Sequence, residues 1–322
     1  MPRVLSWTVC ARLGAVPGST QLAKRPAAYH RRVADEKLLF HYTGLDGLMG
    51  ILASGALWAT DVRYLNDTTE SKFGFDKIDD LLANESSSRF PRPEPLKALS
   101  AAWRGVKEGE REARERQRLF VACFCTDPDL LSQWRGYGRH GYSIGFDRQA
   151  LQVRGGQQPT GYWLREMVYD ETEQRDLVAG ILDHHVEGAP QELQVAPTRD
   201  MDLVSMARLA QAWSFGVGAD LYQLANQFKH RGFQEEREVR AVHQVVPQSP
   251  TTIHVRGTAH GPVPYVCIDI GKAADTTVRE VWVGPTPHQT EAADAVRDLL
   301  RFHGLSAVEV NQSPLPFRWQ AG

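Results

Sequence analysis

Residues 38–60 read LLFHYTGLDGLMGILASGALWAT and predict how the fold begins. Residues 38–42 form an apolar run that ends in a polar tip, which is typical of a buried strand. Apolar side chains in residues 45–52 then recur at the spacing of one helix face, and Gly55 follows where that helix would end. Residues 57–60 predict a second, short strand. This opening indicates a fold that mixes strands and helices.

The rest of the chain continues the mixture without a strict strand–helix–strand alternation. Residues 119–125, LFVACFC, form an apolar run that predicts a central strand. No GxGxxG or GxxxxGK[ST] pattern occurs, which argues against Rossmann and P-loop folds. The other expected elements are strands at residues 142–146, 162–169, 238–246, 265–270, 278–283 and 307–310, and helices at residues 67–82, 96–118, 171–185, 200–229 and 290–303.

This order of elements predicts a single α+β domain over residues 37–322. We expect a mixed or largely antiparallel sheet that is flanked by helices. Residues 1–36 contain glycine, proline and a basic run without sustained periodicity, so we expect them to form an N-terminal appendage.

The composition is that of an ordinary globular protein. Of the 322 residues, 42% are hydrophobic and 24% are charged, and the net charge of −2 provides no global basic field for nucleic acid. No apolar run approaches the ~20 residues that a membrane span needs, so we expect no membrane contact. The four cysteines show neither CxxC nor zinc-ligand spacing, which favours reduced thiols in a cytoplasmic protein and no bound metal.

Polar residues stand at the ends of the first two expected strands. His41 ends an apolar strand, a position from which its ring could contact a ligand, although a hydrogen-bonded histidine at a strand–helix junction is the plainer alternative. In the second group, Asp67 could equally be a helix N-cap. The candidate ligand-binding residues here are His41, Tyr42, Thr43, Arg63, Tyr64, Asn66 and Asp67.

The stretch at residues 132–138 places two aromatic side chains and an arginine among small residues. Glycines let a backbone approach a ligand, aromatic rings stack on flat groups, and arginine can hold a phosphate with two hydrogen bonds. Trp134, Arg135 and Tyr137 are therefore candidate binding residues. The alternative is a surface helix that Trp134 anchors.

An acidic motif opens the strand expected at residues 238–246. Along an extended strand, Glu236, Glu238 and Arg240 would point to one face. Two neighbouring carboxylates repel each other unless a cation or a ligand compensates their charge. Glu236 and Glu238 are candidate catalytic residues, and an ion-pair network with Arg240 is the alternative. We expect these glutamates and the aromatic and polar candidates to form one site.

Taken in order, these motifs resemble a large bacterial family of domains of unknown function. The resemblance spans roughly Leu38 to Arg318. The name of the family implies no activity. Its motifs are His41-Tyr-Thr, Asn66-Asp67, Cys123-Phe, Trp134…Tyr137, Gly141…Phe146 and Lys229…Glu236-x-Glu238-x-Arg240.

More distantly, residues 41–60 and the late Glu236-x-Glu238 resemble ADP-ribosyltransferases of the DNA-modifying toxin type. That resemblance implies an ADP-ribosyltransferase-like fold and NAD as the substrate, with His41 holding the ribose and the nicotinamide amide. It implies that Tyr64 or Tyr137 stacks on the nicotinamide ring and that Arg135 or Arg63 binds the pyrophosphate. Glu238 would be the catalytic carboxylate and Glu236 would orient the acceptor.

The implied function is an ADP-ribosyltransferase acting in a toxin or in antiviral defence. Its acceptor would be DNA, RNA or protein, and an antitoxin or immunity partner would fit that role. Three alternatives remain open: an NAD glycohydrolase with water as acceptor, a non-catalytic module that binds a nucleotide or nucleic acid, and a nuclease with a metal held by Asp67, Glu236 and Glu238.

Overall fold

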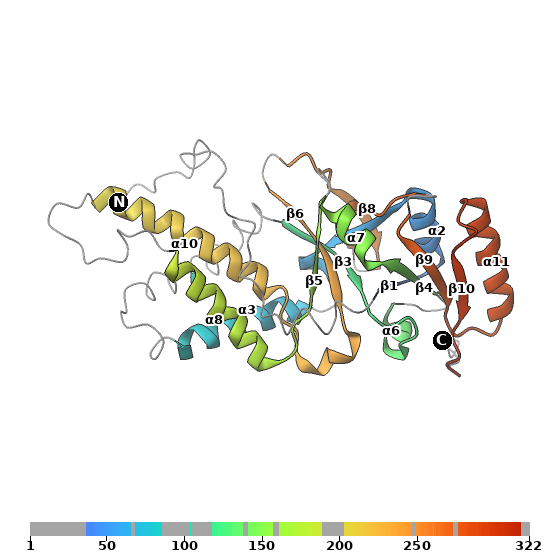
Figure 1. The fold of residues 1–322 in the computed structure, drawn as a ribbon, viewed down its shortest axis with the longest axis horizontal. Coiled ribbons are helices and arrows are strands. Elements are labelled where there is room, and N and C mark those ends of the chain that lie inside the picture. Colours follow the sequence, from blue (N-terminus) through green and yellow to red (C-terminus); the bar gives the residue numbers. More distant parts are fainter. Residues whose placement is uncertain are drawn as a thin grey trace.

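A computed structural model gives the fold of the chain (Figure 1). The part of the chain that it describes comprises residues 37–65, 68–85, 103–104, 118–137, 141–156, 161–188, 203–246, 249–259, 261–272 and 276–316. The fold is α+β, with one mixed and one antiparallel sheet flanked by helices, as the sequence predicts. The appendage expected at residues 1–36 lies outside the described residues.

The smaller sheet contains four strands in the order β1-β4-β9-β10. Neighbours in this sheet run antiparallel except β9 and β10, which are parallel because helix α11 connects them. The register of β4 against β9 shifts between Gly145 and Phe146. The bounds are β1 Leu38–Thr43, β4 Tyr142–Asp147, β9 Val278–Val283, α11 Gln289–Phe302 and β10 Glu309–Gln312.

The larger sheet contains six strands in the order β5-β6-β3-β2-β8-β7, and all its pairs are antiparallel. The apolar run at residues 119–125 forms β3, an interior strand between β6 and β2, as its composition predicts. The bounds are β2 Ala56–Asp61, β3 Arg118–Phe124, β5 Trp163–Glu166, β6 Val239–Val245, β7 His254–Thr258 and β8 Gly261–Asp269.

The largest hydrophobic cluster joins the two sheets. Strands of both contribute to it, for example Ile144 from β4 and Phe120 from β3, and both side chains are fully buried. The amphipathic helix α2, Leu45–Ser54, adds Leu48 and ends at Gly55, whose left-handed backbone (φ 66°) closes the helix as the sequence predicts. Helix α7, Arg148–Gly155, and α11 pack on the same cluster.

Three helices pack together at the other end of the molecule (Figure 1). Ile78, Leu182 and Leu221 form the centre of their shared cluster. Gly74 lets two of the helices approach closely, since a β-carbon there would stand 1.9 Å from the carbonyl oxygen of Ala225. The helices are α3 Thr68–Glu85, α8 Glu171–Glu187 and α10 Leu203–Ala225.

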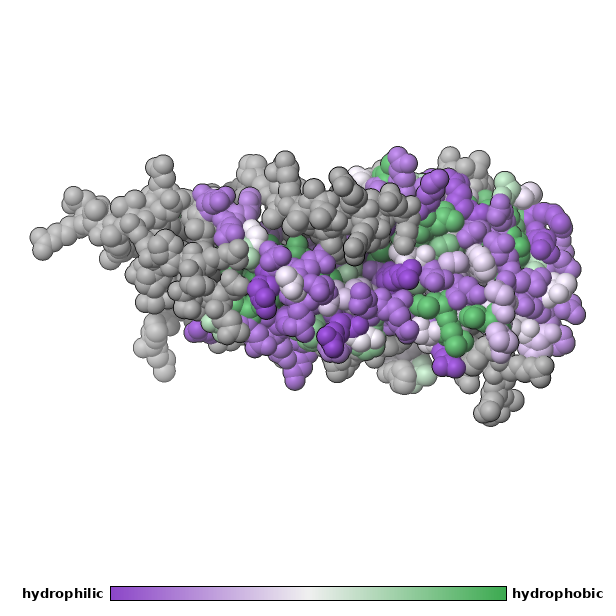
Figure 2. Space-filling view, turned by 60° about the horizontal axis from the view of Figure 1, so that its bottom comes forward, coloured by the Kyte–Doolittle hydropathy of each residue, from purple (hydrophilic) through white to green (hydrophobic). Residues whose placement is uncertain are grey.

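Several short elements were not expected from the sequence. They are the edge strand β7, helix α7, and the 3₁₀ turns η2 at Val62–Tyr64 and η3 at Arg231–Glu236. Helix α6 at Leu131–Gly136 agrees with the alternative given for residues 132–138, a helix that Trp134 anchors. Most of the charged helix expected at residues 96–118 lies outside the described residues, and Arg118 itself begins β3. Among the residues that Figure 2 colours, hydrophilic ones cover most of the face shown, with hydrophobic ones between them. No helix in the described part of the chain is long and apolar enough to cross a membrane.

Candidate functional site

A pocket lies where the two sheets meet. Phe40 of β1 and Cys125, just after β3, exchange two backbone hydrogen bonds of 2.8 Å, which draws the end of β3 away from β2 and towards β1. The pocket encloses about 60 Å³, room for about four water molecules. Its lining comprises Phe40, His41, Tyr42, Cys123, Phe124, Cys125, Gln133, Tyr137, Glu236 and Glu238.

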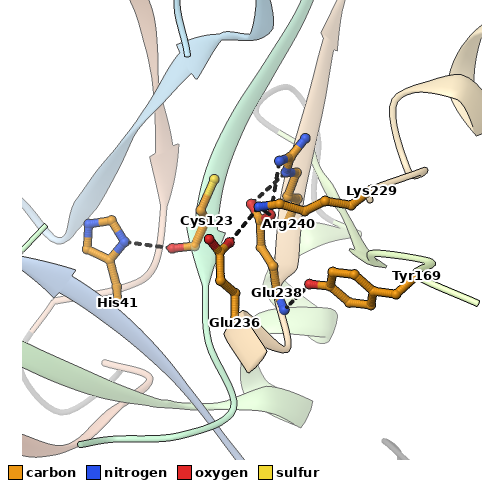
Figure 3. Close-up of polar contacts among 7 residues, drawn as sticks. All are labelled: His41, Cys123, Tyr169, Lys229, Glu236, Glu238 and Arg240. Atoms are coloured by element: carbon orange, nitrogen blue, oxygen red, sulfur yellow. Dashed lines mark hydrogen bonds and ion pairs between the residues drawn. The ribbon is translucent and has the colours of Figure 1, made fainter. Parts of the chain in front are cut away.

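Both candidate glutamates reach this pocket, and a lysine joins them (Figure 3). The Lys229 ammonium donates to the Glu236 carboxylate at 2.5 Å and to the Glu238 carboxylate at 2.9 Å. Arg240 donates to both carboxylate oxygens of Glu238, at 2.6 and 3.0 Å. Two cations and two carboxylates therefore form one network whose members are largely buried.

The backbone that presents the glutamates differs from the expected continuous strand. Glu236 ends the 3₁₀ turn η3, and Arg237 adopts a left-handed conformation with φ 41°, uncommon for a residue other than glycine. Strand β6 begins only at Val239. The prediction that both glutamates lie on one strand is therefore wrong, because the turn at Arg237 intervenes; the contacts to Lys229 bring the carboxylates together instead.

Glu238 is ionised in this environment. Burial by itself raises the pKa of the carboxyl group, but the charges of Arg240 and Lys229 outweigh it, together with hydrogen bonds from Arg240 and the Cys123 thiol. The net effect lowers the pKa of Glu238 to about 2. The backbone N–H of Glu238 also donates to the Tyr169 hydroxyl at 3.0 Å, which fixes the start of β6.

His41 approaches the pocket from the other side of Cys123 (Figure 3). Its Nδ1 lies 2.9 Å from the Cys123 carbonyl oxygen, so Nδ1 carries a proton and donates it. Burial lowers the pKa of His41; the hydrogen bond to Cys123 opposes this shift, and the charge of Arg256 adds to it. The ring is therefore neutral near pH 7, and its Nε2 can accept a hydrogen bond.

Two other aromatic candidates hold the segment that follows β3. The Tyr42 hydroxyl donates to the Asp127 carbonyl at 2.8 Å and accepts from the Leu130 N–H at 2.9 Å. Trp134 is fully buried, packs edge-on against Tyr42 and donates its indole N–H to Asp129 at 2.7 Å. Trp134 thus anchors α6, which places Tyr137 at the pocket with half of its side chain exposed.

The remaining candidates within the described residues do not line the pocket. Arg63 makes hydrogen bonds of 2.9 and 2.7 Å to the buried carboxylate of Asp61, which Arg118 also contacts. Tyr64 is 46% exposed and lies under the Arg63 guanidinium. Thr43 ends β1, Arg135 is exposed on α6, and Asn66 and Asp67 lie outside the described residues. The structure therefore brings together His41, Tyr42, Tyr137, Glu236 and Glu238.

Lys229 belongs to the family motif, but no local pattern in the sequence indicates its role in the site. The missing signal is electrostatic: two buried carboxylates need more positive charge than Arg240 alone supplies. Cys123 and Gln133 also line the pocket and were not candidates. Within the described residues, no group of three or more histidine, cysteine, aspartate or glutamate side chains is arranged to hold a metal ion.

Fold and site together define an α+β protein with an ionised acidic pocket at the junction of two sheets. Residues 133–241 match the model of a family described as a protein of unknown function, DUF2971. The match includes Tyr137, Lys229 and both glutamates, and His41 lies outside it. It supports the resemblance to a family of unknown function. The chain matches no curated protein and no solved structure.

Proposed function

We propose that the chain is an NAD-dependent ADP-ribosyltransferase whose reaction centre is the pocket of Glu236 and Glu238. One observation carries the proposal: both carboxylates face a pocket that His41 and Tyr137 also line. The distant resemblance assigns roles in NAD binding and catalysis to these same four residues. An ADP-ribosyltransferase-like fold and a role in a toxin or in antiviral defence, with an antitoxin or immunity partner, belong to the same proposal.

The chemistry of the transfer suits an ionised carboxylate. The bond between the nicotinamide nitrogen and ribose C1′ breaks, and its electron pair leaves with nicotinamide and neutralises the ring. Positive charge develops on the ribose, as in glycoside cleavage, and a fixed carboxylate stabilises it. With a pKa of about 2, Glu238 carries this charge at any physiological pH.

Each of the other residues has a distinct part in this proposal. The acceptor nucleophile bonds to C1′ and gives its proton to Glu236, whose side chain is 18% exposed against 7% for Glu238. Neutral His41 accepts a hydrogen bond from the ribose through Nε2, and Tyr137 stacks on nicotinamide. Since the pocket encloses only about 60 Å³, it has room for only a part of the nicotinamide-ribose half of NAD, and the rest of NAD would lie outside it.

A second candidate is a binding module without turnover. The observation that favours it is that Lys229 and Arg240 already neutralise Glu238, so that less of its charge remains for a reacting ribose. This candidate predicts that the protein binds a nucleotide and leaves it chemically intact.

The experiment incubates the protein with NAD labelled in its adenylate phosphate, alone and with DNA, RNA or a cell lysate. Beside the native chain we would test Glu236→Gln and Glu238→Gln, and as a matched control Glu171→Gln, whose side chain is 64% exposed on α8. Circular dichroism establishes that each variant is folded.

We expect label on a macromolecule with the native chain and with Glu171→Gln, and its loss in both pocket variants. Free ADP-ribose as the sole labelled product would identify an NAD glycohydrolase instead. Intact NAD in every mixture, with NAD bound by the folded native chain, would favour the binding module and contradict the proposal.

A further inference from the structure

Three aromatic rings form a column across strands β2, β8 and β7, which make up one half of the six-stranded sheet. Trp58 of β2 and Tyr265 of β8 have ring centroids 4.5 Å apart, and His254 of the edge strand β7 stacks on Tyr265 at 5.3 Å. These separations match the spacing of neighbouring strands, so the rings follow one another from strand to strand. Trp58 is 48% exposed and His254 is also exposed, so the residues at both ends of the column reach the surface.

A cation accompanies the column. The Arg256 guanidinium lies 5.8 Å from the centre of the Trp58 ring and donates to the Thr60 hydroxyl at 2.9 Å. Among the described residues Arg256 has no carboxylate partner, and its buried Nε has no hydrogen-bond acceptor. By contrast, Arg63 and Arg240 each pair with a carboxylate. Arg256 therefore keeps a charge that an anionic ligand could neutralise.

The column lies on the same face of the sheet as the acidic network. Trp58 and Thr60 share one face of β2, and Thr60 pairs with Val121 of β3. Val121 and Cys123 share that face of β3, and Cys123 pairs with Arg240, the partner of Glu238. A chain that crosses this face from the column can therefore reach the pocket, and the effect of the Arg256 charge on the pKa of His41 agrees with that proximity.

We propose that the aromatic column of Trp58, Tyr265 and His254, together with Arg256, binds single-stranded nucleic acid. A base stacks on an end ring of the column, and a neighbouring phosphate forms an ion pair with Arg256. This stacking does not depend on the base, since every base has a flat face. The inference that this nucleic acid is the acceptor of ADP-ribose rests on the proposed function. Binding of nucleic acid to the column is measured without NAD, so the binding surface and the proposed function can fail separately.

The test is fluorescence anisotropy of labelled single-stranded DNA, single-stranded RNA and duplex DNA with the full chain. We expect Trp58→Ala to weaken single-strand binding by about 5- to 150-fold, and Trp58→Phe, which keeps an aromatic ring, to retain most of it. The matched control is Trp163→Ala on β5, at the other edge of the sheet and 40% exposed, which should bind like the native chain.

A second readout concerns the phosphate contact. Replacing Arg256 by methionine should reduce the slope of log affinity against log salt concentration by about 0.7, the value for one phosphate of a single strand. The two single-strand arms show whether DNA or RNA is preferred. Absence of single-strand binding by the native chain, preference for duplex DNA, or equal affinities of Trp58→Ala and Trp163→Ala would each overturn the proposal.

Discussion

Replacing Lys229 by methionine tests the acidic network directly. The Lys229 side chain is 4% exposed and bridges Glu236 and Glu238. Methionine fills a similar volume, so the change removes a charge and the hydrogen bonds to both glutamates and leaves little cavity. Glu238 keeps Arg240 as a partner, whereas Glu236 loses its 2.5 Å contact with the Lys229 ammonium.

The expected loss of stability follows from the burial of the network. Removing one partner of a buried ion pair costs about 3–5 kcal/mol, because the remaining charge is left uncompensated. Since Arg240 still neutralises Glu238, we expect the lower end, about 3 kcal/mol. Lys77→Met is the matched control: Lys77 pairs with Glu171, whose side chain is 64% exposed, so the loss should stay below about 1 kcal/mol.

Urea unfolding followed by circular dichroism measures both variants against the native chain, with the slope of the transition compared before free energies are derived. A loss for Lys229→Met no larger than that for Lys77→Met would refute the reasoning that this network is buried and mutually dependent. The double variant Lys229→Met, Glu238→Gln should lose less than the sum of the two single variants, because the residues contact each other.

Three further predictions concern the pH dependence, the segment after β3 and the helix packing. Because folding lowers the pKa of Glu238 to about 2, its contribution to stability is present above about pH 4.5 and is lost as the pH falls towards 2. In an acid titration, Glu238→Gln should therefore lose less unfolding free energy over this pH range than the native chain. Tyr42→Phe removes a hydroxyl with two backbone partners and should lower the unfolding free energy by about 1–3 kcal/mol in urea titrations, with unchanged stability as the contrary result. Gly74→Ala should destabilise the protein by about 1–3 kcal/mol through its clash with Ala225, whereas Gly50→Ala, with open space around it in α2, should stabilise it by about 0.5–1 kcal/mol. Thermal unfolding measures both variants, and a higher melting temperature for Gly74→Ala than for Gly50→Ala would contradict this packing.

The main elements of the fold could be predicted from the sequence because their patterns are strong. The apolar run at residues 119–125 and the alternation at residues 278–283 each form an interior strand. Gly55 marks the end of α2 because its left-handed backbone favours glycine. The short edge strand β7 was missed because strands β7 and β8 together form a hairpin whose residues alternate weakly and include prolines.

The geometry of the candidate site could be predicted only in part. Glu236 and Glu238 were recognised as a pair from their spacing, but the left-handed turn at Arg237 that separates their elements has no marker such as glycine or asparagine. The contact between Lys229 and Glu238 joins residues on either side of η3, and the hydrogen bond between His41 and Cys123 joins residues that are far apart in the sequence. Such tertiary contacts leave no local periodicity in a single sequence.

The most direct test of the proposed function is the release of nicotinamide from NAD, measured by chromatography at neutral pH in the presence of each acceptor class. We predict release by the native chain and by Glu171→Gln, and at least a hundredfold slower release by folded Glu238→Gln, since a fixed charge that stabilises a transition state contributes on the order of 10² or more to the rate. Equal rates of release by the native chain and by folded Glu238→Gln, or no release by the native chain with any acceptor, would contradict the account.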